Sequence, residues 1–82
     1  MARHGIELPN VEDVAAKVHD AWMRQKRAHG VESRILDTTG EELMVPYEDL
    51  SPEAKALDRA TVCAVYDALH DLGIPVYQRV EN

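Results

Sequence analysis

Three side chains in this sequence are of the types that hold a flat, negatively charged ligand. Trp22 and Tyr47 offer aromatic faces, and a nucleobase or another planar ring can stack on such a face. Arg59 carries a planar guanidinium, which binds a phosphate or carboxylate through two parallel hydrogen bonds better than a lysine does. These three residues therefore predict ring stacking combined with an anion clamp.

A short basic segment could add to that clamp. It contains Arg24, Lys26, Arg27 and Arg34, with Glu32 as its one acidic residue. We take Arg24 and Arg27 as candidate ligand contacts. The alternative is a solvated helix end, since cations near the C-terminus of a helix complement its negative dipole end.

Each aromatic or cationic candidate also has a structural interpretation. Trp22 can be a core anchor whose indole N–H needs one partner. Pro46, Tyr47 and Leu50 can fix an extended entry into the following helix. Arg59 can form a tertiary ion pair that ties the preceding segment to its helix. Because the side chains of Asp58 and Arg59 point about 100° apart on a helix, they should have separate partners.

The sequence offers little for catalysis or metal binding. It contains neither a glycine-rich phosphate loop nor a nucleophile elbow. His4, His29 and His70 lack metal-ligand spacing, and no neighbouring basic residue would activate the thiol of Cys63. We predict a protein that is not an enzyme and has neither a cofactor nor a metal.

The length and net charge of the chain indicate how many domains it forms and which partners it does not bind. A chain of 82 residues with 45% hydrophobic residues is the size of one domain. Its net charge of -6 disfavours general binding to nucleic acids or anionic membranes. The sequence lacks an apolar stretch long enough for a membrane span, and its single cysteine suits a reducing compartment. We expect a cytoplasmic protein.

Two helices must position the candidates. The first is expected over about 10–29, with Asn10 as its cap and Gly30 as its stop. The second is expected over about 52–72, capped by Ser51 and stopped at Gly73. Apolar residues repeat at helical spacing in each. In the first they are Val11, Val14, Ala15, Val18, Ala21 and Trp22, and in the second Leu57, Thr61, Ala64, Val65, Ala68, Leu69 and Leu72.

The fold class is therefore mainly α, two packed helices with a short β-hairpin or extended segments between and after them. The hairpin would pair 33–36 with 41–45 around a turn at 37–40, and Ile35, Leu36, Leu43 and Val45 would help cover the helices. Residues 1–9 are expected to form an extended lead-in, 10–77 the domain and 78–82 a tail. The piece 74–77 could add a strand.

The residues placed in this way resemble the ryanodine receptor repeat, or RyR domain. The resemblance is carried by segments in the family's order and spacing between residues 8 and 76. They are His19-Asp20-Ala21-Trp22, Gly30, Leu43-Met44-Val45-Pro46-Tyr47-Glu48-Asp49-Leu50, Asp58-Arg59, Ala68-Leu69 and Leu72-Gly73-Ile74. The family's motif positions thus fall on His19, Gly30, Pro46, Leu50, Asp58 and Gly73.

The resemblance implies a binding role. Such repeats occur in pairs in calcium-release channels and singly in bacterial and viral, including phage, proteins, and this chain has room for one. Here Val31 and Leu57 stand where the channel repeats usually carry aromatic residues, so a contact made by those aromatics would be lost. Ser33, Thr38 and Thr39 have acidic neighbours, and we do not expect them to be kinase sites.

Two hypotheses follow from the resemblance and the candidate residues. In the first, the domain senses a small anionic or nucleotide-derived ligand through Trp22, Tyr47 and Arg59. In the second, it packs against itself or against another protein, as the repeats do at the periphery of the large channels. A two-helix unit with a modest core leaves a face to be covered, which motivates the second hypothesis.

Overall fold

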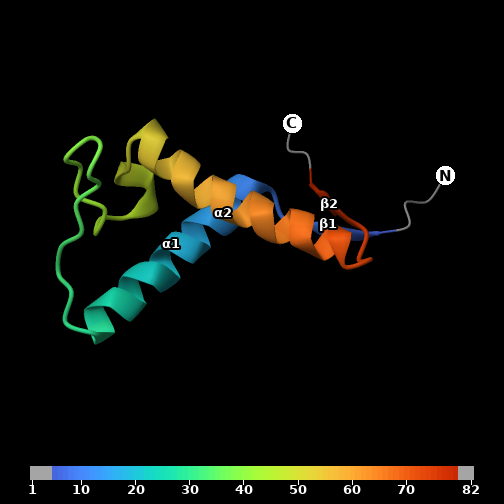
Figure 1. The fold of residues 1–82 in the computed structure, drawn as a ribbon, viewed down its shortest axis with the longest axis horizontal. Coiled ribbons are helices and arrows are strands. Elements are labelled where there is room, and N and C mark those ends of the chain that lie inside the picture. Colours follow the sequence, from blue (N-terminus) through green and yellow to red (C-terminus); the bar gives the residue numbers. More distant parts are fainter. Residues whose placement is uncertain (1–4, 80–82) are drawn as a thin grey trace.

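Two long helices that diverge from a crossing point form the body of the structure, a computed structural model that describes residues 5–79. Helix α1 spans Val11–Ala28 and helix α2 spans Pro52–Asp71. Their arms open into a V, whose wide end is spanned by the connection 29–51 (Figure 1). The predicted mainly α architecture is confirmed, with each helix ending one residue earlier than expected.

The caps at the start of both helices are those predicted from the sequence. Asn10 Oδ1 accepts a hydrogen bond from the Asp13 N–H at 2.9 Å, and Ser51 Oγ accepts one from the Ala54 N–H at 3.2 Å. Each bond satisfies an N–H group that the first helical turn leaves without an intrahelical partner. After α1 and α2, Gly30 and Gly73 have φ of 79° and 89°, angles that glycine adopts without a Cβ penalty.

The predicted hairpin between the helices is reduced to a single antiparallel bridge, Ile35 with Glu42. The turn at 37–40 is present, and the Leu36 N–H donates to the Glu41 carbonyl at 2.8 Å. The ladder does not continue, because the Glu42 carboxylate accepts from the backbone N–H groups of Arg34 at 2.7 Å and Met44 at 3.0 Å. Farther along, Tyr47–Asp49 form a short 3₁₀ helix, η1, which leads into α2.

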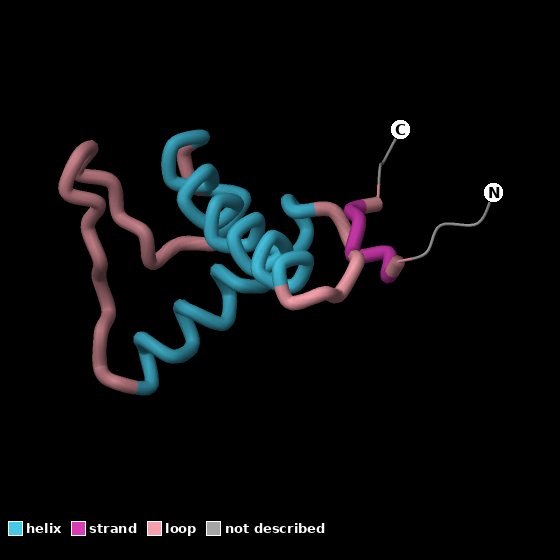
Figure 2. Tube along the Cα trace, turned by 45° about the vertical axis from the view of Figure 1, so that its right-hand side comes forward, coloured by secondary structure: helices cyan, strands magenta, loops and turns pink. Residues whose placement is uncertain are grey.

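A two-stranded parallel sheet closes the other end of the molecule. Strand β1, Ile6–Leu8, pairs in register with strand β2, Val76–Gln78 (Figure 2). The Gln78 side chain also accepts a hydrogen bond from the Val11 N–H at 2.6 Å, at the first turn of α1. The sequence suggested an extended lead-in and a final extended piece, but not their pairing, which links the two ends of the described chain.

The hydrophobic core lies where the helices cross. Its buried members come from α1, from η1 with the residue after it, and from α2. They are Val11, Ala15, Tyr47, Leu50, Ala54 and Val62. Leu43 and Val45 pack against this cluster as expected, whereas Ile35 is 52% exposed and covers nothing in it.

The predicted apolar face of α2 is largely wrong. The buried side chains of α2 are Ala54 and Val62, whereas Leu57 and Val65 are each 53% exposed and Leu72 is 79% exposed. The physical reason is the crossing geometry. Helix α1 meets α2 at the crossing, and the C-terminal half of α2 runs on past the start of α1 (Figure 1), so the apolar residues of that half face outward. Toward the N-terminal end of α2 the two helices diverge into the arms of the V (Figure 1), which leaves Leu57 exposed.

Candidate functional site

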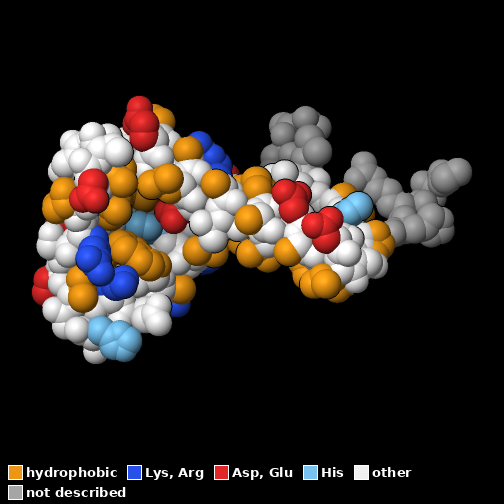
Figure 3. Space-filling model, viewed as in Figure 1, with side chains coloured by type: hydrophobic (Ala, Val, Ile, Leu, Met, Phe, Trp, Pro, Cys, Tyr) orange, Lys and Arg blue, Asp and Glu red, His pale blue; other side chains and the backbone are white. Residues whose placement is uncertain are grey.

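The candidate site is a pocket of about 310 Å³ between the two arms of the V. Most of its wall is apolar, contributed by both helices and by the connection. The apolar lining residues are Val18, Trp22, Leu43, Leu50, Ala54 and Leu57. Figure 3 shows hydrophobic side chains gathered between the arms, with a histidine and an acidic side chain beside them. A predominantly apolar concavity with a few polar groups is typical of small-ligand sites.

His19, Asp58 and Thr61 supply the polar part of the wall. His19 is 3% exposed, and its Nδ1 lies 3.2 Å from Oδ2 of Asp58. Its Nε2 lies 2.8 Å from the Val45 carbonyl oxygen. One imidazole thus joins α1, α2 and the connection, and it fixes the floor of the pocket.

These two contacts restrict the hydrogen bonds that the His19 ring can form. A carbonyl oxygen only accepts, so His19 Nε2 must carry a hydrogen toward Val45. An ionised carboxylate also only accepts, so the His19 Nδ1 contact to Asp58 is a hydrogen bond only when one more proton is shared between them. Burial raises the pKa of Asp58, and the neighbouring His19 partly offsets that rise.

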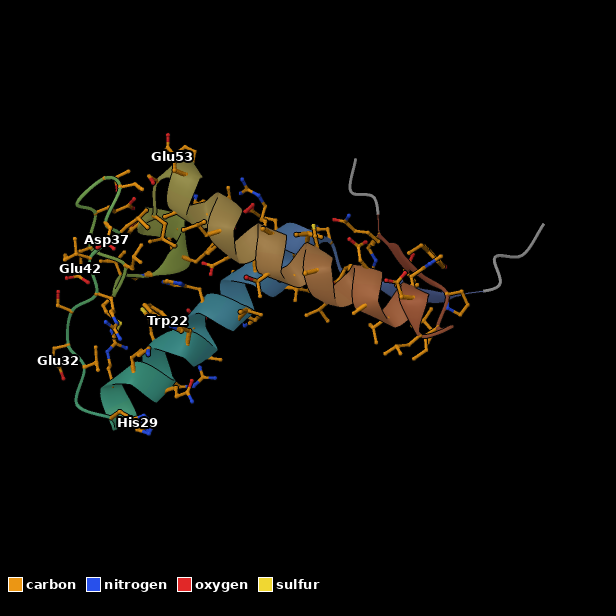
Figure 4. All side chains as sticks on the ribbon, in the orientation of Figure 1. Trp22, His29, Glu32, Asp37, Glu42 and Glu53 are labelled. Atoms are coloured by element: carbon orange, nitrogen blue, oxygen red, sulfur yellow. The ribbon has the colours of Figure 1, made fainter. Side chains whose placement is uncertain are left out.

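Trp22 is the predicted ligand residue that the structure brings to the pocket. Its side chain is partly exposed, so it is not the fully buried anchor of the structural interpretation. It projects from α1 into the opening of the V (Figure 4), and its ring stacks on His19 with centroids 5.5 Å apart. No residue within 5–79 accepts a hydrogen bond from the indole N–H.

Tyr47 and Arg59 meet on a different group, the carboxylate of Glu12 in the first turn of α1. The Tyr47 hydroxyl donates to Glu12 Oε2 at 2.5 Å, and Arg59 Nη1 lies 3.2 Å from Oε1. The Tyr47 hydrogen bond is the main cause that lowers the pKa of Glu12. Neither residue lines the pocket. Arg59 therefore forms a tertiary ion pair, as its structural interpretation predicted, and its partner is Glu12. Asp58 contacts His19 instead, so Asp58 and Arg59 have separate partners, as predicted.

Arg24 and Arg27 are also outside the pocket. Both are exposed on α1, where Lys26 and Arg27 lie in the last turn. That position matches the alternative of cations beside the negative end of the helix dipole.

The family-motif positions fall into two groups. His19, Leu50 and Asp58 line the pocket, whereas Pro46 caps η1 and Gly30 and Gly73 follow the helices. The pocket residues that the sequence reasoning missed are Val18, Leu43, Ala54 and Thr61, together with Leu57 in this role. The i, i+4 repeat of Val18 with Trp22 and of Leu57 with Thr61 was visible, but periodicity does not tell which repeats face each other.

Among residues 5–79, no group of three or more His, Cys, Asp or Glu side chains is arranged to hold a metal ion. Neither α1 nor α2 is both long and apolar enough to cross a lipid bilayer.

Comparisons of the chain with protein families, with curated proteins and with solved structures find no match. The resemblance to the ryanodine receptor repeat therefore depends on the sequence segments quoted above.

Proposed function

We propose that this protein is a non-enzymatic binding module whose pocket between α1 and α2 takes a small ligand with a flat apolar ring. The observation that carries the proposal is the composition of the pocket wall, in which Trp22 and five aliphatic side chains surround the His19–Asp58 pair. A nucleotide-derived compound is one ligand of this kind, with its base in the pocket. The resemblance to a repeat suspected of sensing such signals supports the same class.

The charges in the wall favour the ring of such a ligand over its phosphate. Asp58 is one-quarter exposed at the pocket, and a carboxylate there would repel an anionic group. Arg59, the predicted clamp, is held by Glu12 outside the pocket. We therefore expect the ring to enter and any phosphate to stay in solvent, which departs from the anion clamp predicted from the sequence.

A thermal-shift screen tests the proposal. Adenine and adenosine are compared with adenosine monophosphate, cyclic nucleotides, adenosine diphosphate ribose and inorganic phosphate alone. A ligand at 100 times its dissociation constant stabilises the fold by about 2.7 kcal/mol, a shift of roughly 10 °C or more for a domain of this size. We expect neutral ring compounds to raise the melting temperature and phosphate alone to leave it unchanged.

Two variants locate the site. Thr61→Leu adds bulk at an exposed pocket position without removing a core group. At least ten times more ligand should then be needed to produce the same rise in melting temperature. Arg59→Ala is the control and should leave ligand affinity unchanged. A screen with no shift contradicts the binding proposal, whereas a shift lost in Arg59→Ala moves the site to the Glu12 cluster.

The interaction module remains a second candidate, because α2 carries large apolar side chains that are exposed to solvent. A cytoplasmic, reducing environment belongs to either proposal and suits the exposed thiol of Cys63.

A further inference from the structure

One carboxylate oxygen of Asp58 has no hydrogen-bond partner within residues 5–79. Oδ2 lies 3.2 Å from His19 Nδ1, whereas no group of the described chain donates to Oδ1. Every side-chain nitrogen or oxygen that is closed to solvent in this part of the chain has a partner, so Oδ1 must be open to solvent. Asp58 lines the pocket, with its side chain one-quarter exposed. The pocket is therefore the place where a ligand can meet this oxygen.

Thr61 places a second acceptor on the same face of α2. Its hydroxyl donates to the Leu57 carbonyl at 3.2 Å, which uses the hydrogen and leaves the lone pairs of Oγ1 available. Residues three positions apart on a helix are neighbours on one face, and Asp58 and Thr61 both line the pocket. The α2 side of the pocket thus offers two neighbouring hydrogen-bond acceptors.

The same wall offers a ligand fewer donors. Both ring nitrogens of His19 are engaged, one by Asp58 and the other by the Val45 carbonyl. Neither lysine nor arginine lines the pocket, and the basic side chains beside the opening in Figure 3 are not part of its wall. The indole N–H of Trp22 remains, and it can serve a single acceptor atom. The polar wall therefore suits a ring that donates more hydrogen bonds than it accepts.

The charges of the wall favour the same kind of ring. An ionised carboxylate attracts a positive group and repels a negative one, and a cation within about 6 Å of a tryptophan ring is attracted to the face of that ring. Asp58 and the partly exposed Trp22 line the pocket from opposite helices. His19 weakens the attraction when it is protonated, but the hydrogen bonds that Oδ1 accepts do not depend on it.

We propose that the pocket selects flat rings that carry a planar amino or amidine group, with Asp58 Oδ1 as the acceptor that recognises this group. A second N–H of the same group can reach Thr61 Oγ1, while the ring lies against Trp22. The proposal rests on the proposed function, since it names which ring ligands the pocket takes. Positively charged donor rings should bind best, neutral donor rings less well, and negatively charged rings not at all.

Four small compounds of nearly the same shape test this ranking. Benzamidine is a cation with N–H donors, and benzamide is neutral with donors and one acceptor. Acetophenone is neutral with an acceptor alone, and benzoate is an anion with acceptors alone. The chain has a single tryptophan, so one indole N–H peak in a ¹H–¹⁵N NMR spectrum of the full chain reports on the pocket. Titration with each compound at millimolar concentration, followed at this peak, compares their dissociation constants.

We expect benzamidine to bind about tenfold more tightly than benzamide, because a positive donor strengthens the hydrogen bond to a carboxylate. Acetophenone should bind more weakly than benzamide, and benzoate should leave the peak in place. Asp58→Asn should remove the preference for benzamidine over benzamide. Asp67→Asn makes the same change at an exposed position of α2 and should keep that preference. Circular dichroism checks that both variants fold, and the ranking in the unmodified chain tests the proposal without them.

The outcomes separate this inference from the proposed function. Acetophenone or benzoate binding as tightly as benzamidine would overturn selection by Asp58 and leave a ring-binding pocket in place. A preference for benzamidine that survives in Asp58→Asn would do the same. If none of the four compounds moved the Trp22 peak, the proposed function would fail together with this inference.

Discussion

His19 on α1 and Asp58 on α2 face each other across the helix pair, with Nδ1 of the imidazole 3.2 Å from Oδ2 of the carboxylate. The opposite ring nitrogen lies 2.8 Å from the Val45 carbonyl. Both nitrogens of a side chain that is 3% exposed are therefore engaged. The pair holds the two helices and the connection together at the floor of the pocket, so its integrity should be visible in stability before any ligand is known.

We expect Asp58→Ala to lower the free energy of unfolding by about 1–3 kcal/mol, because it leaves the buried His19 Nδ1 without a partner. Asp58→Asn should lose less, since its amide can donate to Nδ1 of a neutral imidazole while Nε2 still donates to Val45. Urea denaturation at pH 7 measures both. Equal losses in the two variants would show that the hydrogen bond to His19 does not matter.

Glu41 should make the stability of the fold sensitive to acid. Its carboxylate accepts from the Ser51 hydroxyl at 2.6 Å and from the Ser51 N–H at 2.8 Å, at the cap of α2. These bonds, the hydroxyl first, lower the pKa of Glu41 from 4.5. A lowered pKa means that the stabilisation is present above about pH 4.5 and is lost as the pH falls through the folded-state value.

Glu41→Gln should therefore unfold at lower temperature than the unmodified chain at pH 7, and the two melting temperatures should converge as the pH falls below 4.5. Glu48→Gln removes the same charge from an exposed position of η1 and serves as the control. A difference that persists at the acid end would place the effect of Gln in packing rather than in ionisation. Asp58, with its raised pKa, acts in the opposite direction in both chains.

Tyr47 should make the stability of the fold sensitive to alkaline pH. Burial, followed by the hydrogen bond to Glu12, raises the pKa of Tyr47 to about 12 from 10.0. The protonated phenol therefore stabilises the folded state fully below pH 10, and this contribution disappears as the pH rises through about 12. Tyr47→Phe should lose about 1.5 kcal/mol at pH 7, the value of a hydrogen bond to a charged group.

The difference between the unmodified chain and Tyr47→Phe should then shrink between pH 10 and about pH 12. Urea denaturation at pH 7, 9 and 11 follows it, and the absorbance of phenolate near 295 nm reports the titration itself. The pKa of Tyr66 is raised as well, chiefly by burial, but Tyr66 is present in both chains and cancels in the comparison. A constant difference across this range would contradict the link between the phenol proton and stability.

The helix boundaries could be predicted because the signals for them are local. Asn10, Ser51 and Pro52 act on the turn that immediately follows each of them, and Gly30 and Gly73 act on the turn just completed. Such capping depends on hydrogen bonds between residues a few positions apart. The separate partners of Asp58 and Arg59 were predictable for the same reason, since helix geometry alone fixes the angle between them.

The pairings across the fold could not be predicted in this way. His19 and Asp58 lie 39 positions apart in the sequence, and Glu12 is 35 positions from Tyr47, so neither leaves a local pattern. Apolar residues do recur at helical spacing along α2, but the side chains of α2 that are buried are Ala54 and Val62 rather than the predicted ones. Polar residues such as His19 are easily missed as core members, because they are buried only when a distant acceptor satisfies them.

Ala15 should be the position most sensitive to added volume in α1. It is fully buried, at 0% exposure, in the core where α1 crosses α2. Ala15→Leu adds methylene groups that the crossing cannot accommodate without moving a helix, which costs about 1–3 kcal/mol. Ala21→Leu makes the same change at an exposed position of the same helix and should stay within about 0.5 kcal/mol of the unmodified chain. Because leucine and alanine differ little in helix propensity, urea denaturation of the two variants isolates the packing cost. If both variants were equally stable, the helices would be able to separate at the crossing without loss, and the pocket that they enclose would not have a fixed shape.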